Sequence, residues 1–480
     1  MNVDVAIIGS GTAGLAAYRA AKTAGASVAL IEGGEYGTTC ARVGCMPSKL
    51  LIAAAEAVHH AELAPGFGVH IDGKIRVDGA EVMARVRSER DRFVGFVLRD
   101  VEKIPEVDRF RGLARFEDNH TLVVGGSKRI TAKSVVIATG SRVTYPEAFK
   151  KLGDRLIIND DVFSWKDLPK SVAVIGPGVI GLEIGQALHR LGVRVAVLGR
   201  GGRVGPMADP EVRAYAIKTL SQEFVLEPDA HFCGMELDGD RVAICRKNPQ
   251  DVEFTEHFDY VLAATGRSPN VDGIGLDNTS VDCDAARVPI SDATTTQTMT
   301  AAGPGSIFIA GDASNFLPLL HEAADEGRIA GENAARVAAG KPVARGLRRA
   351  PLGVVFTDPQ IATVGGGWQA LEQGRFVVGQ VSFEDQGRSR ILLRNKGLLN
   401  VYGDIATGRL LGAEMIGPAA EHIGHLLAWS LQNQMTIAKM LEMPFYHPVI
   451  EEGLRTALRH LDTNLRSAQS HAQASDTKAA

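Results

Sequence analysis

The chain has 480 residues, of which 45% are hydrophobic and 22% charged, and its net charge of −4 comes from both signs interspersed along the sequence. This composition is typical of a globular protein of two to four domains, and the lack of a basic stripe argues against a nucleic-acid-binding protein. No apolar run reaches about 18 residues and the first strand-like run begins at Val3, so we expect neither a membrane span nor a signal or transit peptide.

The first segment reads as strand, glycine turn, helix and strand. Gly9, Gly11 and Gly14 form the pattern G-x-G-x-x-G directly after an apolar run, and Glu32 ends the next apolar run. In such a unit the first glycine makes a tight turn, the second admits a pyrophosphate, and the third lets helix and strand pack closely. A carboxylate at Glu32 can accept both hydroxyl hydrogens of an adenosine ribose, so we predict a dinucleotide site here.

Two of the five cysteines lie close together in TTCARVGCMPSK, residues 38–49. A zinc site would need further ligands at suitable spacing, and His59 and His60 on the next helix are interpreted as a solvated face. A disulfide that closes so short a loop would constrain the unfolded chain little, whereas a cysteine pair at a helix start favours reversible exchange. We therefore favour a redox role for Cys40 and Cys45. The other thiols are interpreted as ordinary, and the odd count favours a reducing cytoplasm: Cys233, Cys245 and Cys283.

Residues 171–200 repeat the same order of strand, glycine turn, helix and strand, and they carry a second glycine triplet. Two dinucleotide sites in one chain indicate a flavin and a nicotinamide, between which hydride passes. An apolar strand that runs into a glycine turn also occurs twice, at 134–142 and at 260–270. The second triplet consists of Gly176, Gly178 and Gly181.

The second unit lacks the acid of the first. Counting from the third glycine, the position that corresponds to Glu32 is Gly199, and Arg200 and Arg203 follow it. Arginine binds a phosphate dianion through paired charge-assisted hydrogen bonds, so the local chemistry favours acceptance of NADPH. Alternatively, both arginines point to solvent and NADH binds without its usual carboxylate.

The sequence pattern changes near Gly340. The short apolar runs that follow are typical of the strands of an antiparallel sheet. The small polar residues at the C-terminus predict a disordered tail. We predict helices at 79–103, from about His321, at 419–433 and at 449–462, and strands at 307–311, 350–365, 376–383, 397–404 and 409–417.

The segment FYHPVIEE places His447 five residues before Glu452. We predict that Pro448 begins a helix, with His447 at or just before its cap. A carboxylate one turn beyond a histidine can hold the imidazole tautomer and stabilise its cation, as an oriented general base requires.

Residues 38–49 resemble the redox signature of the class I pyridine nucleotide–disulfide oxidoreductases. The resemblance includes both glycine triplets, both ATG turns, IFIAGDA, VVFTDPQIATVG and HPVIEE, and within the family it is strongest to the dihydrolipoamide dehydrogenases. It implies an α/β fold, with two Rossmann-like dinucleotide-binding domains for FAD and NAD(P) and a C-terminal α+β dimerisation domain. The implied boundaries are 1–145 and 271–342 for the FAD-binding and central parts, 146–270 for NAD(P), 343–463 for dimerisation, and 464–480 for the tail.

The resemblance also implies roles for single residues. Cys40 and Cys45 would form the redox-active disulfide, with Cys40 as the more exposed sulfur and Cys45 against the flavin. Lys49 would pair with Glu183 near the flavin, and His447 with Glu452 would serve the disulfide of the other subunit in a homodimer. The implied FAD-binding residues are Gly9, Gly11, Gly14, Glu32, Thr39, Lys49, Thr139, Gly140, Asp312 and His321, and those for NAD(P) are Gly176, Gly178, Gly181, Arg200 and Gly266.

Two positions depart from the family signature. Thr38 replaces the usual second glycine and is interpreted as a harmless loop change, whereas Arg42 replaces the usual asparagine. Arg42 either points to solvent or alters the mouth of the substrate site, which leaves the disulfide substrate open.

The activity implied is oxidation of dihydrolipoamide with NAD⁺, and the main alternative is an NADPH-dependent disulfide reductase of the glutathione-reductase type. A mercuric reductase is disfavoured because no cysteine pair follows Cys283, and a soluble transhydrogenase is disfavoured because Cys40 is present. A non-catalytic flavin-binding scaffold is disfavoured because Cys40, Cys45, His447 and Glu452 are all present.

Overall fold

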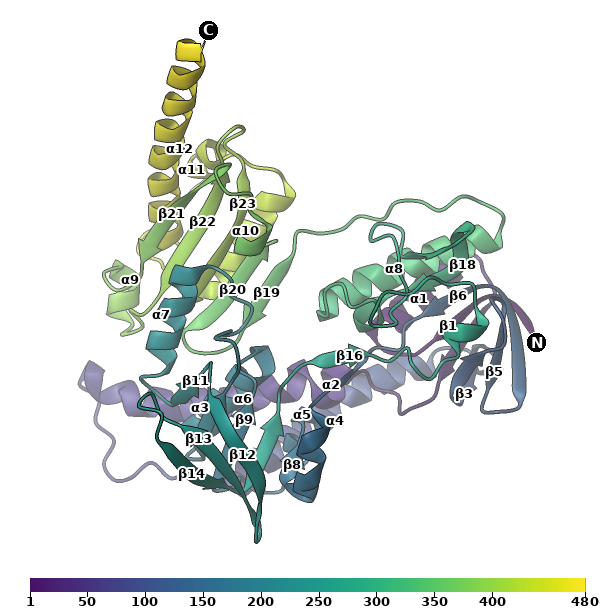
Figure 1. Cartoon of the computed structure of the whole chain (residues 1–480), viewed down its shortest axis with the longest axis horizontal. Helices are drawn as coiled ribbons and strands as arrows, with labels where there is room; N and C mark the ends of the chain where they lie inside the picture. The colour runs from purple at the N-terminus through teal and green to yellow at the C-terminus, as the bar shows by residue number, and fades with distance from the viewer. Residues whose placement is uncertain (480) are drawn as a thin grey trace. The chain divides into compact units, whose positions relative to one another are not determined.

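The computed structural model describes residues 1–479, and Figure 1 traces the chain by colour from N- to C-terminus. The chain divides into two compact units. The first contains residues 1–50, 85–144 and 266–348, and the second contains the remaining segments. No helix in the described part of the chain combines the length and apolar character that a bilayer crossing needs. The domain boundaries expected from the sequence stay predictions.

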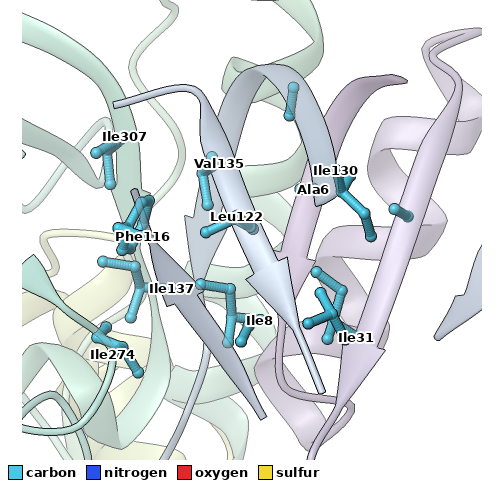
Figure 2. Packing of buried hydrophobic residues seen from close by; sticks show 14 of the residues in the cluster. Ala6, Ile8, Ile31, Phe116, Leu122, Ile130, Val135, Ile137, Ile274 and Ile307 are labelled. Carbon is cyan, nitrogen blue, oxygen red and sulfur yellow. The ribbon is translucent and has the colours of Figure 1, made fainter. Parts of the chain in front are cut away.

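The first unit is built on a largely parallel sheet in the order β17-β18-β6-β1-β2-β3. Strands β18, β6, β1, β2 and β3 run parallel, whereas β17 pairs antiparallel at one edge, and β5 pairs antiparallel with both β4 and β6. Figure 2 shows Ile8, Ile31 and Ile137 of three strands packed with Phe116 and Leu122. The strands are β1 (Asn2–Ile8), β2 (Val28–Glu32), β3 (Arg109–Arg111), β4 (Ala114–Phe116), β5 (Thr121–Val124), β6 (Lys128–Ile137), β17 (Gln297–Thr300) and β18 (Gly303–Ile309).

Helices α1 (Thr12–Thr23) and α8 (Leu320–Ala338) lie side by side against this sheet (Figure 1). Two glycines one turn apart on α8 allow the approach, because a Cβ at Gly327 would collide with the carbonyl oxygen of Ala13, and one at Gly331 with that of Ala17. The backbones of the two helices are therefore in contact, which fixes the start of α8 relative to the first glycine turn. The predicted helix from about His321 is confirmed, as is the one at 79–103, which is α4 (Gly79–Glu102).

The second unit repeats the strand, helix and strand order in β9 (Ser171–Ile175), α6 (Val179–Arg190) and β10 (Arg194–Leu198). The five strands of its parallel sheet follow the order β11-β10-β9-β15-β8. Next to it lies an antiparallel sheet, β12-β13-β14, which the sequence did not predict. These strands are β8 (Leu156–Ile157), β11 (Val225–Glu227), β12 (His231–Asp238), β13 (Arg241–Lys247), β14 (Glu253–Phe258) and β15 (Tyr260–Ala263).

The same unit contains the predicted antiparallel sheet, in the order β19-β20-β23-β22-β21. Its elements are β19 (Leu352–Val355), β20 (Gln360–Gly365), β21 (Phe376–Ser382), β22 (Leu398–Asp404), β23 (Leu410–Gly417), α10 (Ala420–Gln432), α11 (Ile437–Leu441) and α12 (Glu452–Ala479). The other elements of the chain are α2 (Thr39–Val43), α3 (Cys45–Leu63), α5 (Asn159–Val162), α7 (Pro210–Leu220), α9 (Gly387–Ile391), β7 (Ser141–Val143) and β16 (Arg267–Pro269).

Helix α12 corrects the expectation of a disordered tail at 464–480. The helix continues through this region, Leu465 is buried in the core, and two side-chain amides bind backbone carbonyls at the sheet. Asn464 Nδ2 donates to Val378 O at 2.8 Å, and Gln469 Nε2 donates to Ile405 O at 2.7 Å. The small and polar residues of this segment did not exclude a helix, because alanine, glutamine and arginine are also good helix formers. Residue 480 lies outside the described residues.

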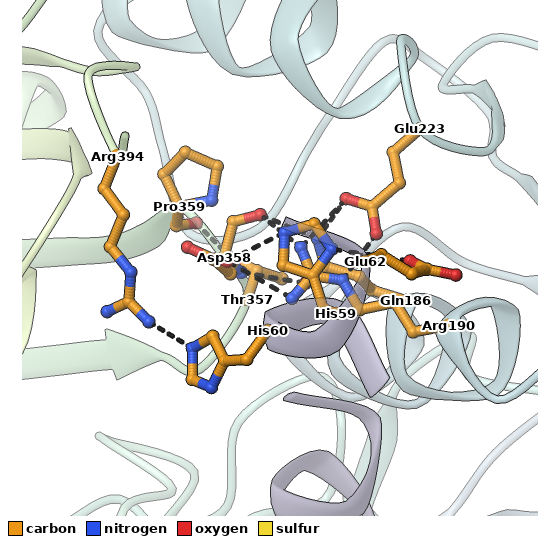
Figure 3. Close-up of polar contacts among 10 residues, drawn as sticks. All are labelled: His59, His60, Glu62, Gln186, Arg190, Glu223, Thr357, Asp358, Pro359 and Arg394. Carbon is orange, nitrogen blue, oxygen red and sulfur yellow. Dashed lines mark hydrogen bonds and ion pairs between the residues drawn. The ribbon is translucent and has the colours of Figure 1, made fainter. Parts of the chain in front are cut away.

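A polar cluster joins helix α6 to the segment before β20 (Figure 3). Arg190 Nη1 lies 3.2 Å from Asp358 Oδ2 and also pairs with Glu223, while Gln186 exchanges two 2.8 Å hydrogen bonds with the Asp358 backbone. His59 Nε2 lies 3.7 Å from the same Asp358 oxygen. Its side chain is only 23% exposed, so the interpretation of His59 as a solvated residue is wrong.

Candidate functional site

The first glycine turn, which contains Gly9, Gly11 and Gly14, has room for a ligand on one side only. Gly9 has φ +105°, and a Cβ there would collide with the Ala138 carbonyl, while one at Gly14 would collide with the Gly9 carbonyl. A Cβ at Gly11 would meet nothing within 4 Å. The turn is therefore packed beneath Gly9 and Gly14 and open at Gly11, where a pyrophosphate can approach the amino end of α1.

The Glu32 carboxylate is held beside this turn. Its Oε2 accepts hydrogen bonds from Ser10 N at 2.8 Å and Ser10 Oγ at 2.7 Å, and its Oε1 accepts one from Gly34 N at 2.7 Å. Because two carboxylate oxygens offer about four acceptor positions and three are used, Glu32 can still accept a ribose hydroxyl at Oε1.

The ATG turn after β6 contains a buried polar atom without a partner. Among the described residues, Thr139 Oγ1 is shielded from solvent and has no hydrogen-bond partner. Buried hydroxyls are normally satisfied, so this atom fits a site that a polar group of a cofactor completes. Gly140 follows with φ +69°, and Ser141 Oγ donates to Asp312 Oδ2 at 2.7 Å. These contacts tie Asp312 to the same turn, whereas Thr39 lies exposed at the start of α2.

A buried ion-pair cluster, which the sequence analysis missed, supports the Asp312 loop. Glu326 Oε2 accepts the Gly311 N–H at 2.8 Å, and Arg348 lies 3.0 Å from Glu326 and 2.9 Å from Glu322. The two glutamates are 4% and 2% exposed. Burial raises the pKa of Glu326, and the Arg348 charge opposes that shift. The sequence did contain a signal for this cluster, because Glu322 and Glu326 are four residues apart and so share one face of α8. His321 lies in the first turn of the same helix.

Cys40 lies in α2 and Cys45 is the first residue of α3. Both are free thiols in the structure. Their hydrogen bond and the burial of Cys40 raise the pKa of the Cys40 thiol, against the opposing charge of Lys49. The two thiols therefore interact directly, with the Lys49 charge nearby.

The expected order of exposure is wrong for the chain described. Cys40 is half-buried, whereas Cys45 is exposed. Cys40 lies within a short helix that packs against Gly44, and Cys45 stands at an open helix start. Exposure therefore does not assign the roles of the two sulfurs, and those roles stay a prediction.

The two departures from the family signature have defined conformations. Thr38 has φ +54°, a backbone region that β-branched residues rarely adopt, and its Oγ1 accepts the Ala41 N–H at 3.3 Å. Arg42 Nη2 lies 2.6 Å from Glu35 Oε2, so Arg42 does not simply point to solvent. Thr38 thus caps α2 from a strained position that glycine would adopt without cost.

The second glycine turn has the geometry of the first. Gly176 has φ +114°, and a Cβ at Gly176 or Gly181 would collide with a backbone carbonyl, whereas Gly178 is open. Gly266, two residues beyond the facing Ala264 carbonyl, has φ +130°.

Position 199, at the carboxyl end of β10, is closed to any side chain. A Cβ at Gly199 would lie 2.6 Å from Pro177 Cδ and 2.7 Å from Pro228 O. Next to it Arg200 is exposed, with its guanidinium carbon 5.4 Å from the centre of the Phe232 ring, and Arg203 is also exposed. Steric exclusion therefore explains why no acidic residue occupies position 199. The loop next to it carries the cationic side chains of Arg200 and Arg203.

Lys49 lies on α3 in the first unit and Glu183 on α6 in the second. Glu183 is buried and its Oε1 accepts the Phe356 N–H at 2.9 Å. Their expected pairing stays a prediction.

His447 and Glu452 do form a pair. His447 Nδ1 lies 3.1 Å and 3.0 Å from the two Glu452 oxygens, and the hydrogen bond from His447 lowers the pKa of Glu452. The prediction that Pro448 begins a helix is wrong. Residues 447–451 form a turn, Val449 N donates to Glu452 Oε2 at 3.3 Å, and α12 begins at Glu452. The carboxylate both holds the turn before the helix and orients the imidazole.

Residues 3–327 match the family described as pyridine nucleotide-disulphide oxidoreductase, and residues 352–458 match its dimerisation domain. The chain belongs to this family. Curated relatives include dihydrolipoyl dehydrogenases of Chlamydia trachomatis serovar D, 31% identical with 96% of this chain and 97% of the relative covered, and of Thermus scotoductus, 32% identical with 95% and 97% covered.

Solved structures share the fold. LpdA from Mycobacterium tuberculosis has a TM-score of 0.80 at 23% identity, with 96% of this chain and 100% of that chain covered. The HOCl-induced flavoprotein disulfide reductase RclA from Escherichia coli, in its Cu(II) complex, has a TM-score of 0.79 at 22% identity, with 96% and 99% covered. The predicted α/β fold with a C-terminal dimerisation domain is confirmed, and this pyridine nucleotide–disulphide oxidoreductase is an FAD-dependent enzyme that uses NAD(P).

Proposed function

We propose that the enzyme oxidises dihydrolipoamide with NAD(P)⁺ as the final electron acceptor, through FAD and a Cys40–Cys45 disulfide. The observation that carries the proposal is the direct contact between the Cys40 and Cys45 thiols, which raises the pKa of Cys40, with the Lys49 charge opposing that shift. The dihydrolipoyl dehydrogenases among the relatives, matched over nearly their whole length, support the choice of substrate.

FAD fits the first unit by chemistry as well as by sequence. The open glycine turn would hold the pyrophosphate, Glu32 the adenosine ribose, and Asp312 the ribityl side, with the orphaned Thr139 hydroxyl satisfied by the cofactor. When bound, FAD accepts two electrons from the reduced cysteine pair and passes hydride to the nicotinamide.

The residues of this chain perform the thiol chemistry. His447 takes a proton from a substrate thiol, while Glu452 holds the other ring nitrogen and stabilises the cation. The substrate thiolate attacks Cys40, breaking the disulfide and releasing Cys45 as a thiolate. The second substrate thiol, deprotonated in turn, attacks the mixed disulfide and frees Cys40, so that one disulfide forms in the substrate as one is reduced in the enzyme.

We also propose a homodimer in which His447 serves the cysteine pair of the partner subunit. The His447 side chain is 80% exposed although its carboxylate partner is in place, and exposed apolar side chains lie in the same domain, among them Tyr446 and Trp429. An oriented base left in solvent is useful only when a second surface covers it. The match of residues 352–458 to a dimerisation domain supports that surface. A cytoplasmic location stays a prediction from the cysteine content.

A second candidate is an NADPH-dependent disulfide reductase. It is favoured by the closed position at Gly199 and the exposed Arg200 and Arg203, which suit a 2′-phosphate better than a 2′-hydroxyl.

Steady-state assays of the purified holoenzyme test both candidates. We expect the highest turnover with dihydrolipoamide as donor, its near-complete loss in Cys45→Ser and His447→Ala, and normal turnover in the control Cys283→Ser. Faster reduction of glutathione disulfide or of a quinone by NADPH than oxidation of dihydrolipoamide would contradict the proposal.

A further inference from the structure

The antiparallel sheet β12-β13-β14, labelled in Figure 1, carries two cysteines and a glutamate whose side chains lie close together. On β13, Val242 and Ile244 are buried, so the alternate residues Cys245 and Lys247 point to the opposite face. Lys247 is the register partner of Glu253 on β14, which puts Glu253 on that face too.

Cys233 joins this face through an irregularity in β12. The register with β13 shifts between Phe232 and Gly234, so that Cys233 stands beside Cys245 at a bulge. Bulges re-aim a side chain relative to a regular strand. The sequence analysis interpreted Cys233 and Cys245 as ordinary thiols, and it did not predict that they lie close together.

The ligand atoms are close enough to share one ion. The Cys233 and Cys245 sulfurs and a Glu253 carboxylate oxygen all lie within 4.8 Å of one another. Among the described residues, this is the one group of three or more His, Cys, Asp or Glu side chains arranged in this way. In a tetrahedral zinc site with Zn–S bonds near 2.3 Å, neighbouring ligands are roughly 3.8 Å apart, which small side-chain rotations would achieve.

The local charges also suit a divalent ion. Two thiolates and a carboxylate would carry three negative charges, which a divalent cation and Lys247 together balance. Metal binding displaces the proton of each thiol, which becomes a thiolate ligand.

We propose that Cys233, Cys245 and Glu253 form a binding site for a borderline-soft divalent metal ion, of which Zn²⁺ is the type. Each thiol releases one proton to solvent, two S–metal bonds and one O–metal bond form, and water occupies the fourth position. All three ligands lie in the second unit, whereas Cys40 and Cys45 lie in the first, so the site does not depend on that cysteine pair.

Equilibrium dialysis of the holoenzyme against zinc, with metal analysis of the protein, tests the site. We expect one zinc per wild-type chain, an affinity at least about a hundredfold weaker in Cys233→Ser and Cys245→Ser, and about tenfold weaker in Glu253→Gln. Cys283→Ser is the matched control, because it removes an exposed thiol elsewhere and should bind zinc normally. Unchanged zinc binding in Cys233→Ser and Cys245→Ser would overturn the proposal.

A second measurement uses the wild-type enzyme and so does not depend on the folding of variants. Zinc should protect Cys233 and Cys245, but not Cys283, from alkylation by iodoacetamide, as mapped by mass spectrometry. A Cys233–Cys245 disulfide in the freshly purified protein, or equal alkylation with and without zinc, would overturn the proposal. Neither outcome depends on dihydrolipoamide oxidation, so failure here is distinguishable from failure of the proposed activity.

Discussion

At the scale of single residues, the cysteine pair shows how position sets chemical role. A hydrogen bond between Cys40 and Cys45, together with burial, raises the pKa of Cys40. Cys45 lies at the start of α3, and a helix amino end is a position that favours a thiolate.

This asymmetry predicts different spectra for two serine variants. Cys45→Ser should bind FAD yet lack long-wavelength charge-transfer absorbance when reduced by two electrons, because the thiolate that faces the flavin is gone. Cys40→Ser leaves Cys45 unpaired and should show that absorbance already in the oxidised enzyme. Absorbance spectra during anaerobic titration measure both, and identical spectra would contradict the assignment.

The second residue-scale prediction concerns Arg200. If its guanidinium binds the 2′-phosphate of NADPH, Arg200→Ala removes a charge-assisted contact of about 1.5–3 kcal/mol, or roughly ten- to a hundredfold in affinity. The Michaelis constant should rise strongly for NADPH and little for NADH. Arg213→Ala, on α7, is a surface control. Equal effects of Arg200→Ala on both coenzymes would show that it binds no phosphate.

At the scale of elements, the start of α8 and the loop before it depend on one buried arginine. Arg348→Ala would leave Glu322 and Glu326 without their cation, which should destabilise the fold by about 3–5 kcal/mol and reduce FAD occupancy. Urea unfolding and the flavin content of the purified protein measure these effects. Arg328→Ala, which breaks an exposed pair on the same helix, should change stability by less than about 1 kcal/mol.

The cluster around α6 predicts a pH dependence of stability. Burial, and next the Arg190 charge, lower the pKa of His59 below its ordinary 6.5, despite the opposing charges of Asp358, Glu223 and Glu62. Below pH 6.5 the unfolded chain therefore binds more protons than the native one at this residue, so its stabilising contribution is present above pH 6.5 and is lost as pH falls.

We expect the urea midpoint of the wild type to fall more between pH 7 and pH 5.5 than that of His59→Gln, whose amide does not titrate. His422→Gln, at an exposed histidine of α10, should behave like the wild type. A parallel pH dependence in wild type and His59→Gln would rule out this residue as the cause.

Sequence reasoning succeeded where a local pattern determines the structure. The glycine turns, the parallel strands and helices α4 and α8 follow from apolar runs and from positions where only glycine fits. It failed where long-range contacts decide. β12 is exposed along most of its length, so few buried apolar residues mark it in the sequence. Arg348 pairs with acids of a different segment, and Leu465 orders a polar tail by packing against the C-terminal sheet.

At the scale of the whole molecule, the proposed dimer predicts complementation between inactive chains. In a hybrid of Cys40→Ser and His447→Ala chains, one of the two sites combines an intact cysteine pair with an intact histidine. Hybrids should therefore recover roughly half of the wild-type activity per dimer, as two-fold symmetry requires. Subunit exchange, with hybrids verified by native mass spectrometry, measures this recovery. Hybrids without activity would mean that each chain uses its own His447.

The closed position at Gly199 limits how this enzyme can be re-engineered. A natural way to convert a site of this kind to strict use of NADH is to introduce a glutamate there, since the first unit has one. Gly199→Glu alone would drive a side chain into Pro177 and the Pro228 carbonyl, and Pro177 belongs to the glycine turn itself. Replacing Pro177 would remove only one of the two clashes, so redesign must also move the backbone at Pro228 before an acid can occupy this position.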